Sequence, residues 1–203
     1  MSADDLNLLA YYLNKAPTEE LHRIDDFRFT PFPKLSGSTR ERAIGDVILF
    51  LKSVDTLDDR LDYMTWFYCW LVSQNVFGPW MLYRLDESSA EQYAQFPERL
   101  ERAMSFPAFD AKMGARISEH GCSACIMTKD TAIDRPQHEV ICMYIPHAVP
   151  YVAVCPLALV SLERLTSAIS SVLQSEGAQL AVGNYANLQG AMAAAKEDFA
   201  LMD

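Results

Sequence analysis

Glycine is scarce in this sequence, and no glycine-rich motif occurs. Only 8 of the 203 residues are glycine. There is no Gly-x-Gly-x-x-Gly run, no phosphate loop ending in Gly-Lys-Ser or Gly-Lys-Thr, no Gly-x-Ser-x-Gly elbow and no His-Glu-x-x-His motif. These motifs bring backbone amides to a phosphate, expose a nucleophilic serine or hold a catalytic zinc. Their absence removes local support for three enzyme classes, and we expect a non-enzymatic protein.

Basic side chains are few compared with acidic ones. The chain has 17 lysines and arginines against 27 aspartates and glutamates, for a net charge of -10. A surface of this sign lacks the positive potential that attracts a protein to a phosphate backbone, so we expect no nucleic-acid partner. The acidic residues are spread along the chain, which is typical of a solvated surface and suits a basic or mixed-charge protein partner.

A long hydrophobic run is also missing. The longest apolar stretch, residues 63–72, has about half of the roughly 20 residues that a membrane helix needs. The start, Met1-Ser-Ala-Asp-Asp, has neither the basic region nor the apolar run of a signal peptide. We therefore expect no membrane partner and a cytoplasmic location. In that compartment an odd number of cysteines, five, indicates reduced thiols or metal ligands rather than disulfides.

Apolar residues follow helical spacing through much of the first 120 residues, although Pro31 and Pro33 predict an extended segment at 27–35. The segment that begins at Thr56 is apolar nearly all round, which predicts a central helix wrapped by others. Capping residues, or prolines suited to a first turn, predict the helix starts. These starts are Asp4, Pro17, Ser38, Thr56, Ser88, Pro97 and Pro107, with the last helix reaching about His120.

Beyond Gly121 the spacing becomes typical of strands. Short β-branched or aromatic runs predict strands at 125–128, 139–145 and 151–155, with a fourth considered at 179–182 before a turn at Gly183. Helices are predicted at 157–174 and 187–202. The predicted class is α+β, with a helix-rich N-terminal layer packed on a small C-terminal sheet of three to four strands with two helices. We expect one domain over 1–203; a subdivision into 1–120 and 121–203 is the alternative.

The last predicted helix carries a narrow apolar seam. Its members recur at spacings of four and three: Leu188, Met192, Ala195, Phe199 and Met202. Such a seam packs on another helix or on the core of its own chain. Packing within the chain is the simpler interpretation, and a homodimer through this helix is the alternative.

One cluster of cysteine and histidine could hold a metal. Cys122 and Cys125 form a Cys-x-x-Cys pair, whose thiolates can converge on one tetrahedral zinc ion, and His120 and Cys142 can supply two further ligands. Zinc sites usually present a second close pair, whereas Cys142 and Cys155 are thirteen residues apart. The competing interpretation is structural: a helix-ending histidine, a cap at Gly121, and cysteines that enter a strand as small apolar residues.

The same residues suggest a thiol enzyme as another alternative. A cysteine nucleophile needs a histidine within hydrogen-bond reach, and Cys122 with His138 is the best pair that the sequence offers. Nothing in the spacing of the two residues demands such a pair. We therefore favour a non-enzymatic intracellular regulatory or adaptor protein that acts by binding another protein.

Overall fold

The computed structural model describes residues 1–26, 32–85, 90–105, 109–130, 137–157, 160–174 and 183–201. The helices in these ranges are α1 (Ala3–Leu13), α2 (Thr18–His22), the short 3-10 helix η1 (Arg23–Asp26), α3 (Arg40–Ser53), α4 (Leu57–Ser73), α5 (Ala90–Ser105), α6 (Leu162–Gln174) and α7 (Leu188–Ala200). The strands are β1 (Trp80–Arg84), β2 (Phe109–Ile117), β3 (Gly121–Asp130), β4 (Glu139–Pro146), β5 (Tyr151–Pro156) and β6 (Gly183–Tyr185).

The strands form one antiparallel sheet in the order β2-β3-β4-β5-β1-β6. The α+β class is confirmed. The sheet is larger than the three to four strands expected, and helices α5 and α6 interrupt the run of strands along the chain. In particular, β1 lies between β5 and β6, although α5 and three further strands separate β1 from β5 in the sequence.

Two strands, β1 and β2, lie in the part of the chain that was expected to form the helical layer, and each departure has a physical reason. β1 is buried on both faces, with Leu82 in one core and Tyr83 in the other, and an apolar run of this kind has no alternation that distinguishes a strand from a buried helix. The helix predicted from Pro107 to His120 is wrong. Residues 106–108 lie outside the described ranges, and the chain from Phe109 onward is β2.

Several predicted boundaries also need correction. Pro97 lies inside α5 instead of opening a helix, and the turn expected at Gly183 is the start of β6. The side chain that caps α3 is Thr39 rather than Ser38; its hydroxyl accepts the Arg42 N–H at 3.3 Å. The helix start predicted at Ser88 and the strand predicted at 179–182 fall outside the described residues.

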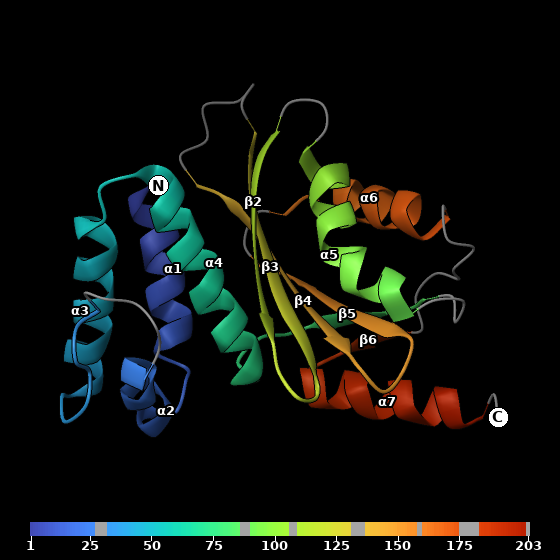
Figure 1. Ribbon diagram of the computed structural model, residues 1–203, viewed down its shortest axis with the longest axis horizontal. Coiled ribbons are helices and arrows are strands. Elements are labelled where there is room, and N and C mark those ends of the chain that lie inside the picture. The colour runs from blue at the N-terminus through green and yellow to red at the C-terminus, as the bar shows by residue number, and fades with distance from the viewer. Residues whose placement is uncertain are drawn as a thin grey trace.

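Helices cover both faces of the sheet (Figure 1). α1 and α4 pack on one face and α3 lies beyond them, while α5 and α6 pack on the other face. The first core includes even-numbered residues of β4 and odd-numbered residues of β3 and β5, and the second includes the residues between them. This division follows from the two-residue period of a strand, which sends successive side chains to opposite faces.

The prediction of a central helix at Thr56 is confirmed. The Thr56 hydroxyl accepts the Asp59 N–H at 3.0 Å, and most residues of α4 from Met64 to Val72 are buried. α4 packs closely on β2 at Gly114, where a Cβ atom would lie 2.7 Å from the Cβ of Thr65. The Cys69 thiol also donates to the Gly114 carbonyl at 3.3 Å. These contacts hold α4 against β2, the edge strand of the sheet.

The apolar seam of α7 faces the sheet of its own chain. Leu188 and Ala195 are buried, and Met192 and Phe199 pack against the same core; Met202 lies outside the described residues. Tyr151 of β5 donates its hydroxyl to Asp198 at 2.6 Å. Among the described helices, none has the length and apolar composition of a membrane span.

Candidate functional site

The proposed zinc ligands are distributed over two faces of the sheet. Cys122 and Cys125 are three residues apart on one strand, so their side chains point to opposite faces. Cys125 lies opposite Cys142 in the core below α1 and α4, whereas Cys122 packs against the core below α5 and α6. His120 is exposed in the turn between β2 and β3. No group of three or more potential metal ligands gathers within the described parts of the chain.

Three of the cysteines form a row across the sheet. Cys125 is opposite Cys142, and Cys142 is opposite Cys155; all three are fully buried and none is in a disulfide. Burial disfavours the charged thiolate and raises the pKa of each thiol. Cys69 of α4 lies over this part of the sheet, and burial raises its thiol pKa in the same way. These residues therefore act as interior packing groups.

Cys122 and His138 lie at opposite ends of the β3–β4 ladder. Cys122 is opposite Ile145, while Glu139, which follows His138 directly, is opposite Thr128. Six residues separate Cys122 from Thr128 along β3, or about 20 Å at the rise of a strand. Burial also raises the pKa of the Cys122 thiol. The structure does not bring this pair within hydrogen-bond reach.

His138 is paired instead with Asp5. Sequence reasoning did not single out Asp5 as a functional residue. The Asp5 carboxylate accepts the His138 backbone N–H at 2.7 Å, and its other oxygen lies 2.9 Å from His138 Nδ1. The second oxygen also accepts the Ser2 N–H at 2.7 Å, in a capping box at the start of α1. The only sequence signal was that box, a serine followed three residues later by an acid; it predicts a helix start and says nothing of a distant histidine.

The environment of Asp5 keeps its carboxylate ionised. Asp5 is 1% exposed, and burial by itself raises the pKa of a carboxyl group. The hydrogen bonds from His138 and Ser2 oppose burial and leave the pKa of Asp5 lower than its usual value. The carboxylate in turn holds the His138 ring in one orientation, because it engages Nδ1 and leaves the Nε2 edge without a hydrogen bond to any described residue.

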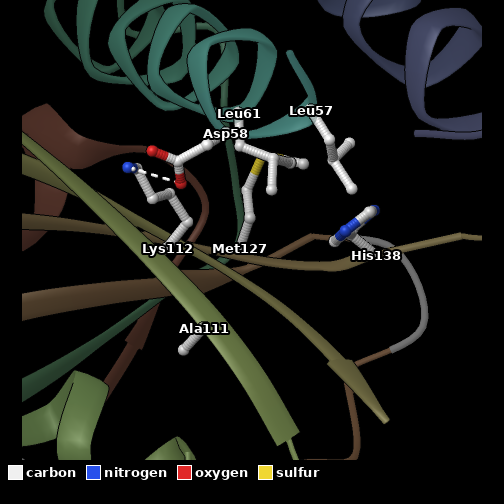
Figure 2. A pocket seen from close by; sticks show the side chains of 7 residues that line it. All are labelled: Leu57, Asp58, Leu61, Ala111, Lys112, Met127 and His138. Carbon is white, nitrogen blue, oxygen red and sulfur yellow. Dashed lines mark hydrogen bonds and ion pairs between the residues drawn. The ribbon is translucent and has the colours of Figure 1, made fainter. Parts of the chain in front are cut away.

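His138 forms one wall of a cleft of about 370 Å³ between α4 and the sheet (Figure 2). Leu57 and Leu61 reach into it from the start of α4, and Met127 rises from β3 to meet them. Leu57 is 50% exposed, whereas Met127 is buried. The cleft therefore has an apolar interior with one leucine side chain half open to solvent at its mouth.

The rim of the cleft is charged, and acids predominate. Lys112 of β2 places its Nζ 2.9 Å from carboxylate oxygens of both Asp58 and Asp62. The hydrogen bonds to these two carboxylates raise the pKa of Lys112, so its amine is protonated at neutral pH. Both aspartates are exposed on the first turns of α4. Around the cleft, acidic side chains thus outnumber the lysine that they surround.

The described lining of the cleft offers a possible general base but no nucleophilic side chain. A paired aspartate and histidine can serve as a general base, but a nucleophile within reach is needed for covalent chemistry. The described lining contains apolar residues, Asp58, Lys112 and His138, and none of them supplies a hydroxyl or a thiol. Comparison with models of known protein families gives no match, and neither does comparison with curated proteins.

Proposed function

We propose that the chain is a non-enzymatic regulatory or adaptor protein that binds another protein through the cleft between α4 and the sheet. The half-exposed Leu57 side chain above an apolar interior carries this proposal. An apolar centre within a polar, charged rim is the usual anatomy of a protein interface. Leu57 is suited to be an anchor that loses its remaining contact with water when a partner docks.

The charge of the rim indicates the chemistry of the partner. Two exposed aspartates, Asp58 and Asp62, lie at the rim of the cleft, and Lys112 is paired with both of them. The net charge of the whole chain, -10, has the same sign as the rim. A basic segment that carries an apolar side chain matches both the rim and the interior, and its attraction to the acidic surface accelerates association.

Two further parts of the proposal concern location and assembly. The five cysteines are free thiols, which supports action in a reducing compartment, the cytoplasm. A homodimer through α7 stays a prediction: the seam packs on its own sheet and leaves Leu201 beyond it 87% exposed. Measurement of the molar mass by light scattering over a range of concentrations tests the dimer directly.

Affinity capture with a matched pair of variants tests the proposed function. Leu57→Asp removes the apolar anchor but keeps a residue that suits the first turn of a helix, where acids are favoured. Leu49→Asp alters another exposed leucine, 63% exposed, on α3. The full chain should capture a reproducible partner with basic segments. Leu57→Asp should lower its recovery about tenfold or more, since burial of a leucine contributes roughly 1.5–3 kcal/mol.

The control defines the outcomes that count against the proposal. Leu49→Asp should retain the captured partner. A wild-type chain that captures nothing reproducible contradicts the binding function itself. Equal recovery with Leu57→Asp and wild type contradicts the cleft as the binding surface.

A further inference from the structure

A second cleft, of about 410 Å³, opens at the end of the β3–β4 ladder away from His138. Its floor is a row of three polar side chains on neighbouring strands. Arg116 of β2 lies opposite Ser123 of β3, and Ser123 lies opposite Tyr144 of β4. Residues directly opposite one another share a face of the sheet, here the face that carries α4. The end of α4 and the first turn of α7 enclose the cleft.

The hydroxyl of Ser123 points to a ligand. Ser123 is only 6% exposed and lines the cleft, yet its hydroxyl makes no hydrogen bond within the described ranges. The Tyr144 hydroxyl, on the same floor, likewise has no partner among the described residues. Both hydroxyls can therefore donate to an acceptor bound in the cleft.

The first turn of α7 supplies a further, independent donor. Asn75 accepts the N–H of Leu188 at 3.1 Å, and Asn187 accepts that of Gly190 at 2.8 Å. The N–H of Gln189, between them, donates to no described acceptor, and Gln189 lines the cleft. The start of a helix carries partial positive charge, so a free amide there favours a negatively charged group.

The charge of the lining also favours a negatively charged ligand. No described lining residue is acidic, in a chain with 27 acidic side chains, while Arg116 and His120 both border the cleft. Val72, Leu188 and Met192 form an apolar wall on the helix side. The cleft therefore combines donors and positive charge on one side with an apolar surface on the other.

We propose that this cleft binds a small organic anion. Its carboxylate or phosphate group accepts hydrogen bonds from Ser123, Tyr144 and the Gln189 amide beside the Arg116 guanidinium, and its apolar part lies on Leu188 and Met192. The volume of the cleft falls within the roughly 300–1,000 Å³ of small-molecule sites. The site is separate from the Leu57 cleft and does not depend on the protein-binding proposal.

Fluorine NMR of two probes with the full chain tests this site. 4-Fluorobenzoate and 4-fluorophenyl phosphate share an aryl body and differ in the anionic group. At least one should broaden on addition of protein, with a dissociation constant on the order of 1 mM, as expected for a fragment-sized ligand. The probe that binds more tightly identifies the class of anion.

Three variants connect binding to the named groups. Ser123→Ala should weaken the better probe about fivefold, corresponding to one hydrogen bond of roughly 1 kcal/mol. Arg116→Gln should weaken it about tenfold or more. Arg42→Gln, at an exposed arginine of α3, is the control and should leave the affinity for the probe unchanged.

Failure of both probes to broaden overturns the proposal. It is also overturned if Ser123→Ala binds as wild type does while its melting temperature is unchanged, or if Arg42→Gln weakens binding as much as Arg116→Gln.

Discussion

Among individual residues, Asp5 combines burial with a carboxylate that needs several hydrogen-bond donors. It is the only acidic side chain in the described part of the chain that is buried, and it accepts three hydrogen bonds, two from His138 and one from Ser2. It joins α1 to the start of β4 across 133 positions of sequence. A buried charge of this kind is stable only with its partners, so its loss leaves His138 without its acceptor.

Replacement of Asp5 should therefore be costly. Asp5→Ala should lower the free energy of unfolding by about 3 kcal/mol, because it removes three hydrogen bonds to a buried carboxylate and leaves their donors unpaired. Asp4→Ala, an exposed neighbour in the same turn, should cost less than about 1 kcal/mol. Urea denaturation of both variants measures the difference. Similar losses for the two variants would show that the Asp5–His138 contact contributes little.

The burial of the cysteines determines how fast their thiols react. Burial raises the pKa of all five cysteines, so little thiolate is present at neutral pH. Iodoacetamide should alkylate every site more slowly than a free thiol, because the thiolate is the reacting form. Cys122, the one partly exposed cysteine, should react first. Mass spectrometry over time measures each rate, and alkylation of Cys122 faster than free cysteine would restore the case for a nucleophile there.

Among the elements, the connection from α4 to α7 depends on Asn75. This residue follows α4 in the left-handed region, with φ of 54°, where asparagine is better tolerated than most residues. From this position its side chain accepts the N–H of Leu188 and so caps the first turn of α7. One residue thus ends one helix and caps the start of another.

Two substitutions separate these roles of Asn75. Asn75→Gly keeps the backbone conformation and loses only the cap, which should cost about 1 kcal/mol. Asn75→Ala loses the cap and also strains the backbone, so the total cost should be about 2 kcal/mol. Thermal or urea unfolding of both variants ranks them. An alanine variant as stable as the glycine variant would contradict the backbone contribution.

Sequence reasoning was most successful where local chemistry determines an element. Thr56 marks the start of α4 by a side-chain cap that the structure confirms. The three strands β3, β4 and β5 were predicted from their β-branched runs. β1 was missed because a strand buried on both faces has no alternation, and its place beside β5 depends on pairing distant in sequence. For β2, alternating residues did offer a signal, which the interpretation of Pro107 as a helix start obscured.

In the whole molecule, the site depends on contacts between distant segments that no local pattern encodes. The Leu57 cleft draws on α4, β2, β3 and the residue before β4. Sequence reasoning identified His138 as a functional candidate but paired it with Cys122, because spacing along the chain does not show the strand register that places the two residues at opposite ends of the β3–β4 ladder. Once the register is known, the opposite faces of Cys122 and Cys125 follow from the period of two.

The stability of the molecule should fall in acid partly through Asp5. Because the folded-state pKa of Asp5 lies below its usual 3.8, the folded protein holds this proton less tightly than the unfolded chain does. The stabilisation from the ionised carboxylate is therefore fully present above the unfolded value and is lost as the pH falls through the folded one. The stability advantage of wild type over Asp5→Asn should shrink between about pH 5 and pH 2. Urea titrations at several pH values measure it, with Asp4→Asn as control; an advantage that grows in acid would contradict this assignment.

Hydrogen exchange of the full chain, with and without the captured protein partner, tests the central claim most directly. The protein-binding cleft lies between the start of α4 and strands β2 and β3. Binding there should slow exchange at residues 57–61 and along 109–117, and should leave α3 and α6 unchanged. Slowed exchange confined to α3, α6 or α7, with the start of α4 unaffected, would contradict the cleft as the docking surface.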